Sequence, residues 1–339
     1  MTSGAPDTLR TQSREAAKRV LVFGATGTIG IALTEELVAR GHKVECVIRP
    51  RSKGAGLPAG FPQGAEVRYG AVTDKASLAR EGFGGEPFDA VFSCMASRTG
   101  EPRDAWAIDH QAHLNVLSLA QAAGASHFVL LSALCVQKPK LAFQQAKLKF
   151  EEALIQSGIT FSIVRPTAFF KSLSGQIDRV RQGKPFLLFG DGRLTACKPI
   201  SDRDLANYLA DCLDRPDRRN QVLPIGGPGP ALTPLDQGEL LFSMVGRAPT
   251  YTRVPVGLLD GIIAVLSGLG TVIPALRTKA ELARIGRYYA TESMLVLEPE
   301  TGTYSAAATP QTGSDTLESY YRQLLEGEAR LERGAHKVF

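Results

Sequence analysis

The chain has 339 residues, of which 44% are hydrophobic and 22% are charged, and its net charge at pH 7 is +5. This composition is typical of an ordinary globular protein, and the length suffices for one large domain or for a domain with an added lobe. The positive excess is small and no long basic run occurs, which argues against a nucleic-acid partner and favours anionic small molecules or anionic lipid.

The first 17 residues are polar and contain no apolar segment, so residues 1–17 are expected to form a flexible N-terminal tail rather than a secretory signal. The five cysteines are scattered and form no Cys-x-x-Cys pair. This pattern predicts neither a disulfide framework nor a zinc site, and it suits a reducing, cytoplasmic location.

Short apolar runs then alternate with helical patterns. The runs expected to form strands are 19–23, 44–48, 67–69, 90–94, 128–131 and 161–164. The helical patterns are 31–40, 105–123 and 143–156. This alternation predicts an α/β fold, a Rossmann-type doubly wound parallel sheet with helices on both faces.

Beyond the sixth expected strand the alternation ends, and glycine and proline accumulate at 224–230 and 246–257. We therefore expect a nucleotide-binding domain over residues 18–215. A smaller, irregular C-terminal substrate lobe is expected over 216–339, with contributions from 166–200.

Residues 256–273 form the most apolar stretch, bounded by Pro255 and Pro274. A spanning helix needs about 20 apolar residues, whereas this stretch contains Asp260 and four glycines. We expect a helix that is buried in the second lobe or lines an apolar site. A patch that touches a membrane surface and a true span are the alternatives.

Gly24-x-x-Gly27-x-x-Gly30 follows the first expected strand and opens the first expected helix. Glycines let the backbone turn tightly and approach a pyrophosphate, whose charge then lies at the helix N-terminus. The sequence therefore predicts a dinucleotide-binding turn. The expected contacts there are Gly24, Thr26, Gly27, Thr28, Ile29 and Gly30.

Arg49 ends the second expected strand and is followed by Arg51, Ser52 and Lys53. A site for NAD places an acidic residue here, whereas the 2′-phosphate of NADP requires a cation. The sequence therefore predicts NADPH as the cofactor, held by Arg49, Ser52 and Lys53. A solvated basic loop is the alternative.

Later strand ends are expected to complete the cofactor site. Segment 69–74 should lie near the adenine, segment 93–97 near the ribose and nicotinamide, and segment 165–170 beside the nicotinamide. The contacts expected from these segments are Val72, Met95, Ala96, Pro166 and Phe169.

Phe143 and Lys147 stand where a reductase of the short-chain type would carry Tyr-x-x-x-Lys. A phenol can give its proton to a carbonyl oxygen as hydride arrives, whereas a phenyl ring cannot. Lys147 is expected to bond to the nicotinamide ribose and to act in catalysis, with Ser132 as a second catalytic candidate. A surface charge at Lys147 and a turn-capping role for Ser132 are the alternatives.

The helical stretch 105–123 carries Asp109-His110-x-x-His113, with two histidines on one face. No third ligand is evident in the sequence, so we expect no metal site.

Several longer segments resemble the divinyl chlorophyllide a 8-vinyl-reductase family, an atypical branch of the short-chain dehydrogenases. The segments are 125–133, 135–139, 143–151, 162–173, 197–201, 221–229, 285–290 and 292–295. The resemblance extends over about residues 18–325, and Phe143 belongs to the family pattern. It implies NADPH-dependent reduction of the 8-vinyl group of a magnesium divinyl chlorin to ethyl, in chlorophyll or bacteriochlorophyll synthesis.

The resemblance also implies how the reaction proceeds without a tyrosine at residue 143. Hydride reaches the outer carbon of the vinyl group and the negative charge spreads into the macrocycle. Phe143 and Phe170 are expected to stack on the macrocycle and Lys171 to contact the substrate, with a plain core role as the alternative for the rings. The proton donor stays open between water, Lys147, Ser132 and Cys135.

Two other functions remain possible at this point. One is a sensor or structural subunit that binds NADPH and catalyses nothing, and the other is an ene or quinone reductase that acts on a non-tetrapyrrole. Peripheral contact with a photosynthetic membrane through 256–273 is the alternative for that stretch, and the oligomeric state is left open.

Overall fold

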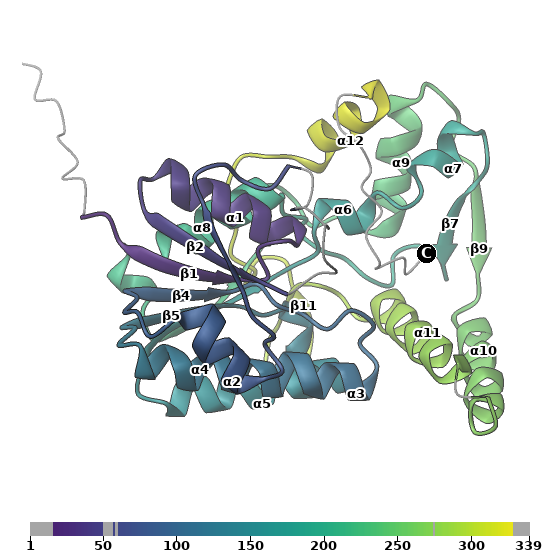
Figure 1. The fold of residues 1–339 in the computed structure, drawn as a ribbon. Coiled ribbons are helices and arrows are strands. Elements are labelled where there is room, and N and C mark those ends of the chain that lie inside the picture. Colours follow the sequence, from purple (N-terminus) through teal and green to yellow (C-terminus); the bar gives the residue numbers. More distant parts are fainter. Residues whose placement is uncertain (1–15, 50–56, 58–59, 274, 328–339) are drawn as a thin grey trace, which may run out of the picture.

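The computed structural model describes residues 16–49, 57, 60–273 and 275–327. Its centre is a parallel seven-stranded sheet in the order β3-β2-β1-β4-β5-β6-β8 (Figure 1). The strands are β1 Arg19–Phe23, β2 Lys43–Ile48, β3 Glu66–Tyr69, β4 Ala90–Ser93, β5 His127–Leu131, β6 Thr160–Pro166 and β8 Gln221–Ile225. The order confirms the expected Rossmann-type, doubly wound sheet.

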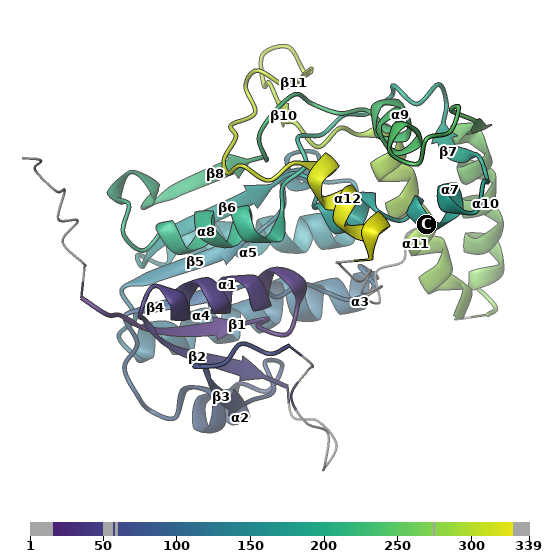
Figure 2. The ribbon, with the colours of Figure 1, turned by 90° about the horizontal axis from the view of Figure 1, so that it is seen from above.

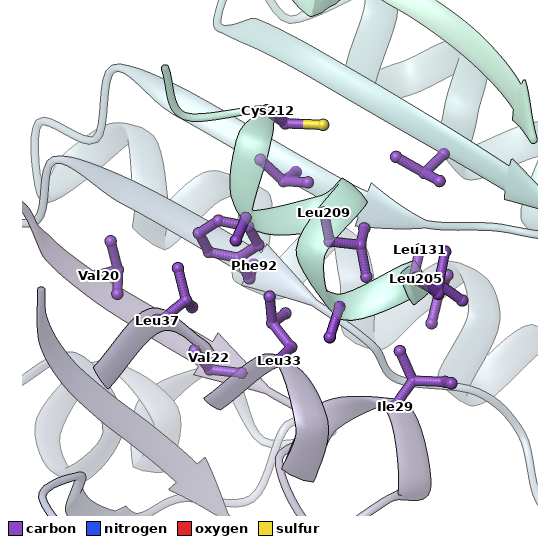
Figure 3. Packing of buried hydrophobic residues seen from close by; sticks show 14 of the residues in the cluster. Val20, Val22, Ile29, Leu33, Leu37, Phe92, Leu131, Leu205, Leu209 and Cys212 are labelled. Atoms are coloured by element: carbon purple, nitrogen blue, oxygen red, sulfur yellow. The ribbon is translucent and has the colours of Figure 1, made fainter. Parts of the chain in front are cut away.

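The side chains of β1 alternate between two hydrophobic cores, one on each face of the sheet. Val20 and Val22 pack against α1 and α8 (Figure 3), whereas Leu21 and Phe23 pack against α4 and α5. Strand residues buried on both faces are what a central parallel strand requires. The helices are α1 Thr28–Ala39, α8 Asp202–Asp211, α4 His113–Ala122 and α5 Ala142–Gln156.

The helix expected over 105–123 is longer and less regular than its sequence suggested. It comprises α3 (Pro102–Ala105), a wide π-helical segment (Trp106–Ala112) and α4. Such segments occur often at functional sites, and this one carries Asp109. The other short elements are α2 Lys75–Ser77, a π-helical segment Leu78–Phe83, the 3₁₀ turns Leu134–Gln137 and Pro216–Arg218, β10 Val296–Leu297 and β11 Tyr304–Ser305.

A second lobe lies beside the carboxyl ends of the strands, with its own hydrophobic core (Figures 1 and 2). Phe186, Phe242 and Tyr321 lie at the centre of that core. The parallel strands β7 and β9 form a small separate sheet there. The elements are α6 Phe170–Leu173, α7 Ile177–Arg181, β7 Phe186–Phe189, α9 Pro234–Met244, β9 Tyr251–Val254 and α12 Leu317–Glu326.

The expected domain boundary at residue 215 needs correction. Strand β8 lies beyond it, yet pairs with β6 in the central sheet. The chain therefore enters the second lobe after β6, returns for α8 and β8, and leaves again for α9. Pro224 within β8 is compatible with this position because β8 is an edge strand, where the missing N–H leaves no ladder bond unmade.

The apolar stretch forms helix α10 (Val256–Gly270), which makes a hairpin with α11 (Ala275–Thr291) at the outer end of the second lobe (Figures 1 and 2). The expectation of a buried helix was wrong, because Leu258, Val265 and Leu269 are exposed along one face. Among the described residues, no helix combines the length and the apolar character that crossing a membrane requires.

Candidate functional site

The site lies where the carboxyl ends of parallel strands meet. Strand β1 lies between β2 and β4, and the chain continues from β1 toward β2 and β3 before it returns to β4 on the other side. In doubly wound sheets the crevice at such a reversal holds the ligand. The turn after β1 borders this crevice.

The turn after β1 is so tightly packed that two of its glycines have no room for a side chain. Gly24 has a φ of +76°, and a Cβ there would lie 2.6 Å from the backbone of Cys94. A Cβ on Gly30 would lie 2.1 Å from the carbonyl oxygen of Gly24. Both positions therefore depend on glycine for the path of the backbone.

The remaining glycine of the turn faces outward and leaves space for a ligand. Gly27 precedes the first turn of α1 and is exposed, as are Thr26 and Thr28. Gly27 has no side chain that could cap the helix, so the first N–H groups of α1 are available to an anion. Ile29 is 6% exposed and packs in the core, so only its backbone can contribute. This arrangement fits a pyrophosphate.

Of the other expected cofactor residues, two lie outside the residues that the structure describes, and the contacts of the rest with a cofactor stay predictions. Arg49 follows β2 and is exposed, whereas Ser52 and Lys53 lie outside the described residues. Met95 and Val72 are almost buried, and the carbonyl oxygen of Val72 accepts a hydrogen bond of 3.0 Å from the Asn115 side chain.

The segments after β4 and β6 also reach the crevice edge of the sheet. Ala96 is exposed next to the buried Met95. Pro166 ends β6 and is buried, and Phe169 is half-buried against the core that contains α1 and α8.

Lys147 forms a buried ion pair with Asp109. The ammonium lies 3.1 Å from the Asp109 carboxylate, and the two side chains are only 10% and 0% exposed. The same Asp109 oxygen also accepts the backbone N–H of Ser97, whereas its other oxygen has no hydrogen-bond partner among the described residues. A buried lysine needs such a partner, so the pair holds the ammonium in one place.

Asp109 was not among the residues selected from the sequence. Its partner, Lys147, lies 38 positions later on another helix, so no local spacing rule connects the two residues. The one signal was its place beside His110 and His113, a pattern that was weighed only as a metal site and set aside.

His113 lies behind this ion pair and is held neutral. Its Nδ1 donates to the carbonyl oxygen of Ile108 at 2.8 Å, and its Nε2 accepts from the Ser93 hydroxyl at 2.9 Å, the tautomer being assigned from these partners. Burial lowers the pKa of His113 to about 4, and the positive charge of Lys147 acts in the same direction. Both ring nitrogens are therefore engaged within the protein.

Ser132 is 5% exposed, and its hydroxyl donates to the carboxylate of Glu151. Glu151 also pairs with Arg165 at the end of β6. This arrangement favours a structural role for Ser132 over the expected catalytic one, because its proton is held by a carboxylate. Glu151 lies four positions after Lys147 on α5, a spacing that could have identified it.

The three residues expected to bind substrate have different surroundings. Phe143 is half-buried and packs in a cluster with Cys135, Ile285 and Tyr288. Phe170 is 3% exposed, and its ring centroid lies 5.5 Å from that of Tyr320 in the second lobe, which favours packing over stacking on a ligand. Lys171 reaches the glycine turn, where its Nζ donates to the Thr28 hydroxyl at 3.0 Å.

The family described as NAD(P)H-binding matches residues 24–216. A divinyl chlorophyllide a 8-vinyl-reductase of Cucumis sativus is 52% identical over 94% of this chain and 79% of its own length. The enzyme of the same name from Zea mays is 50% identical over 94% of this chain and 82% of its own length. Both relatives are named as chloroplastic proteins.

Solved structures share the fold at lower identity. An NADPH-dependent quinone oxidoreductase of Escherichia coli, in complex with NADPH, superposes with a TM-score of 0.64 at 20% identity. The match covers 90% of this chain and 99% of that one. It therefore extends across both lobes, and it supports the arrangement of the fold.

The buried neutral His113 predicts a pH dependence of stability. The pKa of His113 is about 4 in the folded protein, whereas the ordinary pKa of a histidine is 6.5. Between these two pH values the unfolded chain therefore binds more protons than the folded protein does. The free energy of unfolding should therefore fall as pH decreases through this window, by ~3 kcal/mol in full. His113→Gln should be less stable at neutral pH but lose less on acidification.

Urea unfolding of both proteins at about pH 7.5 and at about pH 5 measures this difference. His127, whose pKa burial also lowers to about 4, remains in both proteins and so cancels. An equal loss in the two proteins would show that His113 is not the titrating group.

Proposed function

Because the chain belongs to the divinyl chlorophyllide a 8-vinyl-reductase family, we propose that it reduces the 8-vinyl group of a 3,8-divinyl magnesium chlorin to an ethyl group. The observation that carries this proposal is the 50% identity to the maize reductase over 94% of this chain. The match spans the nucleotide-binding sheet and the second lobe alike. The chain is thus proposed to be an oxidoreductase that acts on a carbon–carbon double bond.

We propose NADPH as the reductant. Membership of the NAD(P)H-binding family establishes a nicotinamide cofactor, and the residue after β2 bears on the choice between its two forms. Arg49 is exposed there, and a guanidinium suits a 2′-phosphate, whereas NAD sites place a carboxylate at this position. The exposed turn of Thr26, Gly27 and Thr28 would hold the pyrophosphate.

Bound NADPH supplies a hydride, and the protein positions the groups around it. Lys147 would bond to the nicotinamide ribose, and Asp109 keeps the ammonium in place through the 3.1 Å contact. Because that pair is almost completely buried, it can hold one geometry without competition from water. The protein would thereby hold the nicotinamide and the substrate in the orientation that the reaction requires. Such orientation is a major part of the rate enhancement in reactions of this kind.

The phenyl ring at residue 143 is consistent with this chemistry. Hydride addition to a vinyl group creates negative charge on carbon that spreads into the macrocycle, so no alkoxide needs an acid at this position. Phe143 packs with Leu141 and Ile285, which keeps this side of the cleft apolar and suited to a flat, apolar substrate.

We also propose that α10 contacts an anionic membrane surface, from which an apolar pigment would be supplied. Its exposed face presents Leu258, Ile262, Val265 and Leu269, spaced as one stripe along the helix. Exposed cations flank the helix: Arg253 precedes it, and Arg277 and Lys279 follow it. An apolar stripe next to cations is the pattern of a helix that lies in the interface of anionic lipid.

Purified protein mixed with NADPH and 3,8-divinyl chlorophyllide a should yield a product heavier by two hydrogens, detected by mass spectrometry after separation of the pigments. The reaction should depend on NADPH. Absence of product, with NADPH binding shown separately, would favour a non-catalytic sensor or a reductase of another conjugated alkene.

Arg49→Ala should weaken binding of NADPH by ~10-fold or more and leave binding of NADH almost unchanged, because it removes a charge-assisted contact to the 2′-phosphate. Titration of both nucleotides by fluorescence measures the two dissociation constants. Arg322→Ala, which removes an exposed cation on α12, is the matched control. Equal losses for both nucleotides would place the phosphate elsewhere.

Ile262→Asp should reduce cosedimentation with vesicles that contain anionic lipid, because it places a charge in the apolar stripe of α10. Ile155→Asp alters an isoleucine of similar exposure, 47% against 41%, on α5 instead, and it should have no effect. Equal binding of both variants and of the unaltered protein would exclude α10 as the contact.

A further inference from the structure

Helix α11 brings two phenols to the place where α5 carries Phe143. Ile285 and Tyr288 pack in one cluster with Phe143 and Cys135. A Cβ built on Gly100 would lie 2.7 Å from Ile285 and 3.6 Å from Phe143, so the two side chains meet over this glycine. Residues 285, 288 and 289 share one face of a helix by their spacing. The face of α11 that meets Phe143 therefore includes both tyrosines.

The first of these phenols, that of Tyr288, is hydrogen-bonded to the backbone. Tyr288 is 4% exposed, and its hydroxyl lies 2.9 Å from the carbonyl oxygen of Cys135 and 3.1 Å from that of Lys138. Carbonyl oxygens are strong acceptors, so this proton is used to hold α11 against the segment after β5.

The second phenol has no such strong partner. The hydroxyl of Tyr289 lies 3.8 Å from the Cys135 sulfur, which is a weak acceptor. The residue is 37% exposed, and its ring packs edge-on against Tyr288, with centroids 5.6 Å apart. Its proton is therefore held only by a weak acceptor.

The position of Cys135 connects this phenol to the proposed cofactor site. Burial raises the pKa of Cys135, while the positive charge of Lys147 acts in the opposite direction, so the thiol lies within electrostatic range of that ammonium. The Tyr289 hydroxyl contacts Cys135, and Cys135 packs in one cluster with Phe143.

The other candidate acids are less suitable. The Ser132 proton is held by the Glu151 carboxylate. Lys147 is held in its ion pair with Asp109. The Cys135 thiol is 1% exposed, so it does not regain a proton from solvent directly.

We propose that Tyr289 is the general acid of the reduction, so that α11 supplies the phenol that α5 lacks. The inference rests on the proposed function. Hydride forms the new C–H bond at the outer vinyl carbon, and the electron pair of the double bond moves to the inner carbon and the macrocycle. The O–H bond of Tyr289 then breaks, its proton forms the second C–H bond at the inner carbon, and the phenolate regains a proton from water.

The Tyr289 phenol is protonated at neutral pH, as a general acid must be. The pKa of Tyr289 is raised well above its ordinary value of 10, chiefly by burial. The transfer remains favourable because an alkyl C–H group is a far weaker acid than any phenol. The phenol thus stays protonated at neutral pH and yields its proton only after hydride has arrived.

Tyr289→Phe tests the proposal with the intact protein, NADPH and 3,8-divinyl chlorophyllide a. The value of kcat should fall by about 100-fold or more, while KM and the dissociation constant of NADPH stay within about twofold because the ring remains. Tyr288→Phe is the matched control on the neighbouring residue. It should lower thermal stability through the lost backbone contacts but retain most of kcat.

A second measurement separates an acid from a packing residue. In deuterated water, the unaltered enzyme should place deuterium at the inner carbon in one configuration, which NMR can resolve because the chlorin is chiral. Product formed by Tyr289→Phe should carry both configurations, because its proton comes from solvent.

Three outcomes would overturn the assignment. They are full kcat in Tyr289→Phe, equal losses in Tyr288→Phe and Tyr289→Phe, and mixed configurations from the unaltered enzyme. Absence of turnover in the unaltered protein would instead overturn the proposed function together with this inference, so the two failures are distinguishable.

Discussion

The close passage of the turn after β1 over the end of β4 is the constraint on which the site depends. Gly24 touches the backbone of Cys94, and Gly30 touches the carbonyl of Gly24, at distances that exclude any side chain. This contact sets the direction of α1 and therefore the place where its first N–H groups point. It also holds the segment after β4 against the turn, so that Met95 and Ala96 border the same crevice. A side chain at Gly24 or Gly30 would displace both the turn after β1 and the segment after β4.

The second lobe is attached to the first through the segment that follows β5. Glu292 is 5% exposed and receives the ammonium of Lys138 at 2.7 Å and the hydroxyl of Tyr304 at the same distance. Burial acts to raise the pKa of Glu292, but these bonds outweigh it and the pKa is lowered. Gln137 adds two bonds to the backbone of Leu295 and Leu297. Such a buried, satisfied network fixes one arrangement of the lobes.

The contacts of Phe143 show what a phenylalanine does at this position. Taken alone, a phenylalanine in place of tyrosine suggests a lost activity. In the structure its ring packs in an apolar cluster with Ile285 and Tyr288 of α11, and Tyr289 follows on the same helix. The second lobe thus brings a phenol, that of Tyr288, into the cluster of Phe143, whereas α5 contributes none there.

The sequence by itself determined the parallel sheet and the glycine turn, and it selected Lys147 as a candidate site residue. Strand periodicity, turn chemistry and helix spacing are local properties of the chain, so neighbouring residues suffice to predict them. The resemblance of long segments also identified the family. Only the tertiary structure decided that Asp109 holds Lys147, that β8 returns to the sheet, and that α10 exposes its apolar face. Each of these depends on contacts between elements far apart in the chain, for which no local pattern exists. For the same reason the sequence selected Ser132 and overlooked Tyr289: a residue's partners are set by packing, not by its neighbours in sequence.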